Sequence, residues 1–268
     1  MTEDMENIKP GEDHYSATKS VPAISRSASY VMIILAYGLG AVSLIFFMIF
    51  LFKSSLNFVS LNLSHTAALG LNMCLSLAFF IQHSIMVRRS FRSWMSKIIK
   101  AQYHGAIFTM ASGVFLLIMV VFWQKIDYTL ASPQGVLRWL LHAVFFLSFA
   151  GFYWGVKALG SFDAFGTTSI KKHLRGKKPP PTMPFVIRGP YRWVRHPLYF
   201  FCLLLIWSCP DLTADRLLFN ILWTAWILVG VILEERDLVT DFDDAYRSYQ
   251  RGVPMIIPWR INPPTDYS

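Results

Sequence analysis

The sequence predicts an all-α fold, a multi-pass membrane helix bundle of about six helices in which the fifth is short. Composition is the first reason: of 268 residues, 54% are hydrophobic and only 15% are charged, whereas soluble domains carry about 25% charged residues. Mean hydropathy is +0.42. Second, apolar runs of the length that crosses a bilayer recur along the chain. Third, basic residues concentrate in alternate connections between these runs, as in membrane proteins.

Six apolar runs define the expected helices in chain order. The first four each reach the roughly 20 residues that cross a bilayer, and they lie at 30–52, 63–86, 105–123 and 136–159. The fifth, at 197–209, is too short to span without tilting, so we expect neighbouring helices rather than lipid to shelter it. The sixth, at 217–233, is nearly long enough to span.

Charge orients the bundle. The connection at 87–104 holds five basic residues and no acid, and the connection at 160–195 holds eight basic residues against Asp163 alone. The other connections are short and nearly neutral, and the last of them contains Asp211, Asp215 and Arg216. The positive-inside rule therefore places both basic connections and both termini in the cytosol. Because the net charge of +9 comes mostly from these loops and no nucleic-acid-binding motif is present, we expect membrane lipid and no nucleic acid as a partner.

These features divide the chain into four parts. Residues 1–28 are polar and mixed in charge without an evident signal peptide, and we expect a disordered cytosolic tail. A four-helix transmembrane region follows at 29–160. Residues 161–195 form a basic, Pro-rich cytosolic connection, whose proline run favours an extended polyproline conformation. Residues 196–268 hold a C-terminal helical hairpin and a cytosolic segment after it.

Charged and aromatic residues gather at the mouth of this hairpin. His196 opens the fifth helix, and LEERDL at 233–238 closes the sixth. Antiparallel packing would bring five side chains to one membrane depth: Arg195, His196, Tyr199, Glu234 and Glu235. Inward-facing ionisable groups at that depth are functional candidates, although ordinary membrane anchoring is the alternative for the arginine. Since adjacent helical residues point about 100° apart, we expect one glutamate, Glu235, to face the bundle.

Metal and nucleotide sites of the usual kinds are not predicted. The histidines of the apolar runs stand alone, without the repeated HxxxH or HxxHH boxes of membrane di-iron enzymes: His65, His83, His104 and His142. The three cysteines lack the CxxC spacing of structural zinc sites. A GxGxxG loop after a strand is also missing, which excludes a soluble Rossmann-type methyltransferase or dehydrogenase. We therefore expect no metal.

Six segments resemble one protein family. RGPYRWVRHPLYF at 188–200, LEERDL at 233–238 and DAYRSYQRGVPMIIP at 244–258 resemble the integral-membrane methyltransferases related to isoprenylcysteine carboxyl methyltransferase. Three more resemble its nurim and methanethiol S-methyltransferase branch: FFIQHSIMVRRSFRSW at 79–94, LGSFDAFG at 159–166 and CPDLTADRLLF at 209–219. The resemblance covers about residues 60–260, and the combination of motifs is specific although each piece alone is weak.

The resemblance implies S-adenosylmethionine as the methyl donor and a C-terminal cytosolic cofactor-binding segment. His196, Tyr199 and Glu235 match cofactor-site positions of the family. Tyr246 and Tyr249 match the tyrosines that help to close the pocket. These residue types suit the donor, because aromatic faces hold a sulfonium cation and a glutamate accepts hydrogen bonds from ribose hydroxyls or the ammonium group.

The acceptor that the resemblance implies is a small thiol, methanethiol, which methylation converts to dimethyl sulfide. Thiols react as thiolates, so Arg195 is expected to favour the anion and His196 to accept the proton; with Glu235 they form the expected catalytic set. His83 and Ser84, near the end of the second helix, are candidates for the substrate-side wall. An ordinary helix-end hydrogen bond is the alternative for both. The branch also implies a bacterial inner membrane.

Two other functions stay open. One is a methyltransferase for a lipophilic or isoprenoid acceptor, and the other is a non-catalytic, nurim-like membrane scaffold. A transporter has no support, because neither paired broken helices nor repeat symmetry is present.

The chain departs from the family pattern at FDDAY, residues 242–246, where the family commonly has F-G-x-x-Y. Asp243 replaces a glycine, so we expect a positive φ or a close backbone approach at this position. Aspartate tolerates a left-handed backbone better than most residues do, and the pocket can therefore survive the change.

Overall fold

The computed structural model describes residues 24–160, 162–177, 185 and 187–259. Within these residues the prediction of an all-α fold is confirmed: the chain forms α-helices, two short 3₁₀ turns and one two-stranded sheet. Most of the predicted tail, residues 1–23, lies outside the described residues, as do the proline run at 179–181 and the end of the chain from 260.

The helices follow the apolar runs. Their bounds are α1 (Arg26–Lys53), α2 (His65–Val87), α3 (Arg89–Met95), α4 (His104–Phe122), α5 (Gly135–Ala158), α6 (Thr168–Leu174), α7 (Pro197–Trp207) and α8 (Ala214–Gly252). The 3₁₀ turns are η1 (Ala101–Tyr103) and η2 (Gly189–Arg192). Among the described residues, five helices are long and apolar enough to cross a membrane: α1, α2, α4 with the preceding η1, α5 and α8. The short fifth helix is confirmed as α7, which has 11 residues.

Local sequence explains where several helices begin. Ser25 caps α1 by accepting a hydrogen bond from the backbone N–H of Ala28, and Ser64 caps α2 in the same way; serine is among the preferred N-cap residues. α7 begins at Pro197, whose fixed φ and missing N–H suit the first helical turn. α1 starts at Arg26, so the last residues of the predicted 1–28 tail are helical.

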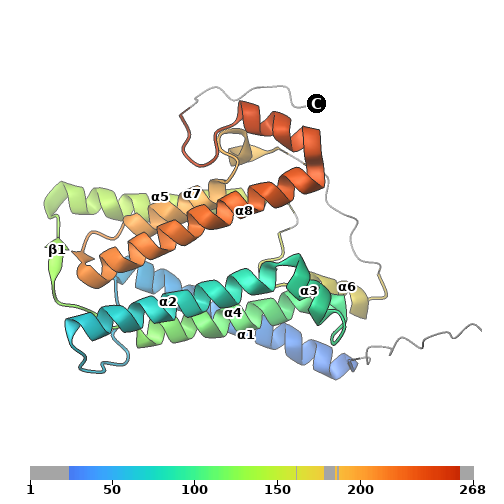
Figure 1. Ribbon diagram of the computed structural model, residues 1–268, viewed down its shortest axis with the longest axis horizontal. Helices are drawn as coiled ribbons and strands as arrows, with labels where there is room; N and C mark the ends of the chain where they lie inside the picture. The colour runs from blue at the N-terminus through green and yellow to red at the C-terminus, as the bar shows by residue number, and fades with distance from the viewer. Residues whose placement is uncertain (1–23, 161, 178–184, 186, 260–268) are drawn as a thin grey trace, which may run out of the picture.

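The apolar helices pack in two layers (Figure 1). α1, α2 and α4 form one layer, α5, α7 and α8 form the other, and α2 meets α8 between them. At the end where α8 begins, strands β1 (Thr129–Ala131) and β2 (Leu212–Thr213) pair antiparallel across the two layers.

The fourth predicted span, α5, makes aromatic contacts with the end of α1. It packs mainly along α7 of the predicted C-terminal hairpin. Two glycines of α5 allow this approach: a Cβ atom on Gly151 would lie 2.3 Å from the ring of Phe201, and one on Gly155 would lie 2.7 Å from Leu198. Small residues at a helix interface let backbones come close in a membrane. α7 is thus sheltered by protein on both sides, as its length requires.

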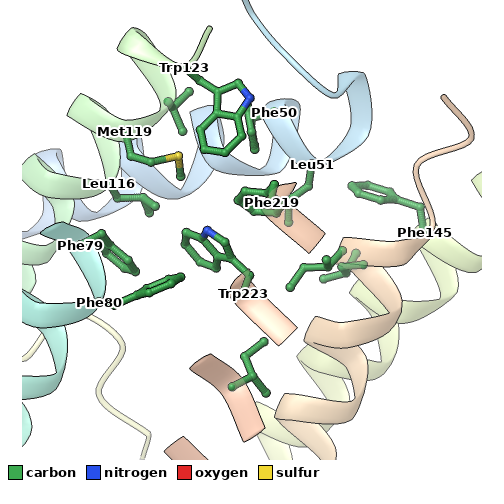
Figure 2. Packing of buried hydrophobic residues seen from close by; sticks show 14 of the residues in the cluster. Phe50, Leu51, Phe79, Phe80, Leu116, Met119, Trp123, Phe145, Phe219 and Trp223 are labelled. Carbon is green, nitrogen blue, oxygen red and sulfur yellow. The ribbon is translucent and has the colours of Figure 1, made fainter. Parts of the chain in front are cut away.

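An aromatic cluster fills the space between the layers (Figure 2). Trp223 of α8 stacks on Phe79 of α2 with 5.2 Å between ring centroids, and on Phe47 of α1 at 4.9 Å. Phe219, one turn earlier, packs edge-on against Phe50 of α1 at 5.1 Å. Offset and edge-to-face aromatic pairs of this kind add to the free energy of burial. The cluster therefore holds the first half of α8 in a fixed orientation.

The start of α8 contains two buried charged residues that the sequence pattern placed in the connection before the sixth predicted helix. Asp215 and Arg216 both have 0% exposure and lie in the first turn of the helix. Asp215 accepts hydrogen bonds from Trp123 Nε1 (3.0 Å) and from the backbone N–H of Ile126 (3.2 Å). Arg216 donates to carbonyl oxygens near the C-terminal ends of α7 and α1. The bonds from Arg216 satisfy carbonyl oxygens at two helix ends that would otherwise be unpaired.

Candidate active site

A bidentate ion pair joins the start of α7 to α8. Arg195 Nε lies 2.6 Å from Glu235 Oε1, and Nη2 lies 3.0 Å from Oε2. The side chains are 9% and 13% exposed, respectively. Paired charge-assisted bonds of this geometry are both strong and orientation-specific. The predicted antiparallel arrangement of the hairpin, with Glu235 facing inward, is confirmed.

Arg195 makes further bonds that tie the C-terminal segment to the site. Nη1 donates to the carbonyl oxygens of Gln250 (3.0 Å) and Val253 (2.5 Å). The guanidinium therefore serves three partners and is charge-neutralised by one of them. Its expected role in favouring the thiolate stays a prediction.

Glu235 accepts hydrogen bonds from three more side chains. His196 Nε2 lies 3.1 Å from Oε1, Gln250 Nε2 lies 2.9 Å from Oε2, and the hydroxyl of Tyr246 lies 3.3 Å from Oε1. Burial alone would raise the pKa of Glu235, but the hydrogen bonds from His196 and Arg195 outweigh it and lower the pKa to about 2. The carboxylate, two residues beyond the apolar run at 217–233, is therefore ionised and fully engaged at neutral pH.

The backbone at residues 195 and 196 is paired with the C-terminal segment. The N–H of Arg195 donates to the carbonyl of Pro254 (2.9 Å), and the N–H of His196 donates to that of Met255 (3.0 Å). The Tyr249 hydroxyl donates to the carbonyl of Tyr191 in η2. These main-chain bonds explain why the motifs at 188–200 and 244–258 belong together.

A kink in α8 makes this arrangement possible. Asp243 has φ 38° and ψ −116°, the one non-helical residue inside the described helix, and Figure 1 shows α8 turning back near its end. The expectation of a positive φ at this position is confirmed. After the turn, Tyr246 and Gln250 point toward Glu235. Tyr246 and Tyr249 are 1% and 3% exposed, and their role in closing the pocket stays a prediction.

Sequence reasoning missed two residues of the cluster. Gln250 lies four residues after Tyr246, on the same helical face, but its approach to Glu235 depends on the kink at Asp243. Tyr191 lies beside Glu234, and burial followed by the negative charge of Glu234 raises its pKa. Its phenol is therefore neutral at physiological pH.

His196 occupies the centre of the site. Its residue is 5% exposed, its ring centroid lies 5.7 Å from that of Tyr199, and its second ring nitrogen, Nδ1, lies 3.8 Å from Oε2 of Glu234. Glu234 Oε2 is buried and has no hydrogen-bond partner, while the whole side chain is 44% exposed. The glutamate that we expected to face away from the bundle thus also turns one oxygen inward.

An open pocket lies next to the ion pair. Its volume is about 360 Å³, and it is lined by Ile232, Glu235, Arg236, Val239 and Gln250. Within the residues that the structure describes, no group of three or more His, Cys, Asp or Glu side chains is placed to hold a metal ion. The polar groups that line the pocket are one carboxylate, one guanidinium and one amide, which suit an organic ligand with both donors and acceptors of hydrogen bonds.

His83 and Ser84 of α2 pack against α8, away from the ion pair. Ser84 Oγ accepts a hydrogen bond from Trp226 Nε1 (3.1 Å), and the ring of His83 packs edge-on against Trp226 at 5.3 Å between centroids. Trp226 precedes Glu235 by nine residues, which corresponds to about 13 Å along a helix. The structure thus places both residues on the α2–α8 contact and not against the ion pair.

Comparison with known proteins identifies the family. A family model described as NnrU protein matches residues 72–255. Methanethiol S-methyltransferase of Pseudomonas deceptionensis is 34% identical over 200 residues, which cover 73% of this chain and 75% of that protein. Methanethiol S-methyltransferase 1 of Bradyrhizobium diazoefficiens is 30% identical over 258 residues, 89% of this chain and 87% of that protein.

More distant similarity extends to nurim. Nurim of Rattus norvegicus is 25% identical over 191 residues, 64% of this chain and 68% of that protein. No solved structure matches the chain significantly. The family match at 72–255 includes the kink at Asp243 and the ion pair of Arg195 with Glu235, which build the candidate site. The chain belongs to the NnrU protein family, in the branch that contains nurim and the methanethiol S-methyltransferases.

Proposed function

We propose that this protein is a membrane methyltransferase that transfers a methyl group from S-adenosylmethionine to methanethiol and releases dimethyl sulfide. The observation that carries the proposal is the intact cluster of Arg195, His196 and Glu235 beside an open pocket, at the end of an apolar helix pair. We choose methanethiol as the methyl acceptor because the relatives at 30% and 34% identity are named methanethiol S-methyltransferases.

The pocket suits the donor. Its volume of about 360 Å³ falls in the range of small-molecule sites, about 300–1,000 Å³. Ile232 and Val239 would contact the adenine, and Arg236 could bind the donor carboxylate by charge-assisted hydrogen bonds. Tyr199 presents an aromatic face near His196, which suits a sulfonium. When bound, the donor supplies an electrophilic methyl group.

The protein's own residues would act by positioning. Methyl transfer is an in-line displacement, and holding two reactants in line can account for much of the barrier reduction. The Arg195–Glu235 pair fixes the start of α7 against α8, and the segment at 253–256 closes the site through backbone bonds. In this scheme Glu235 and Tyr249 hold the C-terminal segment and the start of α7 in place around the pocket. Tyr199 and His196 would contact the two reactants.

Membrane placement would bring the two reactants to the same depth. Methanethiol is small and apolar and can arrive through lipid, whereas the charged donor arrives from water. The basic connections at 87–104 and 160–195 favour a cytosolic site and cytosolic termini. The bacterial origin of the methanethiol S-methyltransferase relatives favours a bacterial inner membrane.

The test is a headspace assay on purified protein in lipid. Methyl-labelled S-adenosylmethionine and methanethiol are supplied, and labelled dimethyl sulfide is the expected product. Glu235→Gln keeps the shape of the side chain but removes the charge that pairs with Arg195, and we expect loss of product. Asp237→Asn removes the same charge from an exposed residue of α8 and serves as the matched control.

The other outcomes separate the alternatives. Donor binding without labelled dimethyl sulfide would favour a lipophilic or isoprenoid acceptor, which a set of thiol-bearing prenyl compounds would then identify. Absence of both donor binding and product would favour a nurim-like scaffold, the reading that the similarity to nurim keeps open.

A further inference from the structure

One ring nitrogen of His196 and one carboxylate oxygen of Glu234 face each other without a hydrogen bond between them. Nδ1 of His196 and Oε2 of Glu234 are 3.8 Å apart, which is too long for a hydrogen bond. Glu234 Oε2 is buried and has no hydrogen-bond partner. A buried acceptor without a donor costs free energy, so this pair is arranged for a donor that arrives with a ligand.

The tautomer of His196 follows from its other contact. Nε2 lies 3.1 Å from Glu235 Oε1, and this carboxylate is ionised and bound to Arg195. A carboxylate only accepts, so Nε2 must carry the hydrogen. In the neutral ring, Nδ1 is then a lone-pair acceptor that faces Glu234. The hydrogen bond to Glu235 thus selects which nitrogen can take a proton.

Glu234 connects this position to water. Oε2 is buried beside His196, yet the side chain as a whole is 44% exposed. His196 itself is 5% exposed, so the half-exposed Glu234 side chain offers the wider route to solvent. A proton received at Nδ1 would form an N–H that points at Glu234, and the carboxylate could pass it outward.

Other groups around the pair are not suited to this role. From η2, Tyr191 stays neutral because its pKa is raised by burial and by Glu234. From α7, Tyr199 also stays neutral, because burial and the negative charge of Glu234 raise the pKa of its phenol. From α8, Glu235 already accepts from Arg195, His196 and other partners. Nδ1 of His196 and the buried Oε2 of Glu234 are the basic atoms of this group that face each other without a donor.

We propose that His196 and Glu234 form the proton-accepting pair for the thiol, with Nδ1 of His196 as the general base and Glu234 as the relay to water. The inference rests on the proposed function. The S–H proton goes to Nδ1, and the sulfur electron pair forms a bond to the methyl carbon of the donor. The bond between that carbon and the sulfonium sulfur breaks, and its electron pair stays on the donor as a neutral thioether. The proton then leaves through Glu234.

The experiment compares thiols of different acidity in the Glu234→Gln variant. General-base catalysis contributes about 10²–10⁴-fold, so we expect kcat with methanethiol to fall by about 100-fold or more. An aromatic thiol, which is largely ionised at neutral pH, needs no base, and its turnover should remain near that of the unchanged protein. Raising the pH should restore part of the activity with methanethiol. Donor binding, measured by calorimetry, should be unchanged.

Controls keep the result interpretable. Asp237→Asn removes a charge from the same helix at an exposed residue and should behave like the unchanged protein. Glu234→Asp keeps a carboxylate and should retain more methanethiol activity than Glu234→Gln. Thermal unfolding of each variant in detergent shows whether it is folded.

The other possible outcomes contradict either the role of Glu234 or the proposed function. Full methanethiol activity in Glu234→Gln overturns the inference and leaves the proposed function intact. Equal loss with methanethiol and the aromatic thiol, or loss of donor binding, also overturns it, because Glu234 would then shape the site or hold the donor. If the unchanged protein methylates no thiol, the proposed function itself fails.

Discussion

Adjacent charged residues occur at the start of α8 and midway along it, and the carboxylates at the two places differ in how completely they are bonded. At the start, Asp215 is fully buried and both of its oxygens accept hydrogen bonds from the opposite layer. Midway along the helix, Glu235 is equally engaged, but Glu234 keeps a buried oxygen without a partner and a side chain that reaches solvent. A fully bonded carboxylate fixes a helix in place, whereas an unfilled acceptor beside water leaves a capacity for chemistry. Substitutions of the carboxylates at the two places should therefore separate stability from turnover.

The largest effect is expected for Arg195→Ala. Removing the guanidinium leaves Glu235 buried without its counter-charge and two carbonyl groups without a donor. Breaking a buried pair in this way costs about 3–5 kcal/mol, and methyl transfer should fall to background. Thermal unfolding and the headspace assay measure the two losses. Arg195→Lys keeps the charge but cannot form the bidentate contact, so near-normal behaviour of that variant would contradict the importance of the geometry.

Asp215→Asn should lower stability without changing the chemistry of the folded protein. One of the two donors from Trp123 and Ile126 loses its acceptor, which costs about 1–3 kcal/mol. kcat per folded molecule and donor affinity should stay the same. The control is Asp211→Asn, which breaks a partly exposed pair with Arg138 and should cost about 0–1 kcal/mol. A fall in kcat for Asp215→Asn would show that the start of α8 is coupled to the site around Glu235.

Asp243→Gly should stabilise the protein by about 1 kcal/mol or more. Asp243 is held at φ 38°, and a non-glycine residue in such a conformation carries about 1–3 kcal/mol of strain. The ion pair lost with Arg247 is exposed and contributes little. Asp244→Gly, at the next residue and in a helical conformation, should instead destabilise by about 0.5–1 kcal/mol. Thermal unfolding that shifts both variants in the same direction would argue against the strain.

The smallest effect is expected from pH in the physiological range. The pKa of Glu235 is lowered from its usual value near 4.5 to about 2, so the folded state favours the ionised form. The stabilisation from its contacts is therefore fully present above about pH 4.5 and is lost as the pH falls toward 2. Unfolding temperature followed from neutral to acid pH should show a Glu235-dependent loss only in that acid window, and Glu235→Gln should not show it.

Sequence patterns predicted much of this molecule because they depend on local rules. Apolar length identified the spans and the short α7, and the motifs at 188–200 and 233–238 correctly placed Arg195 beside Glu235. The pairing of α5 with α7 could not be predicted in the same way, since it depends on a close approach at Gly151 and Gly155.

The residues that sequence reasoning missed share a physical reason. Gln250 reaches Glu235 only after the backbone turns at Asp243. Asp215 and Arg216 resemble ordinary loop charges until the donors and carbonyls of the opposite layer are known. In both cases the partner lies far along the chain, and no local pattern specifies it.

The shortness of α7 has a consequence for how the protein is made. Eleven residues are too few to be retained in a bilayer as an independent span, since about 20 are needed. During synthesis α7 should therefore enter the membrane together with α8 as a hairpin, against an α5 that is already in place. Arg195 would remain without its main partner until residue 235 has been translated, 40 residues later. Membrane insertion and assembly of the site thus become a single late event in biogenesis.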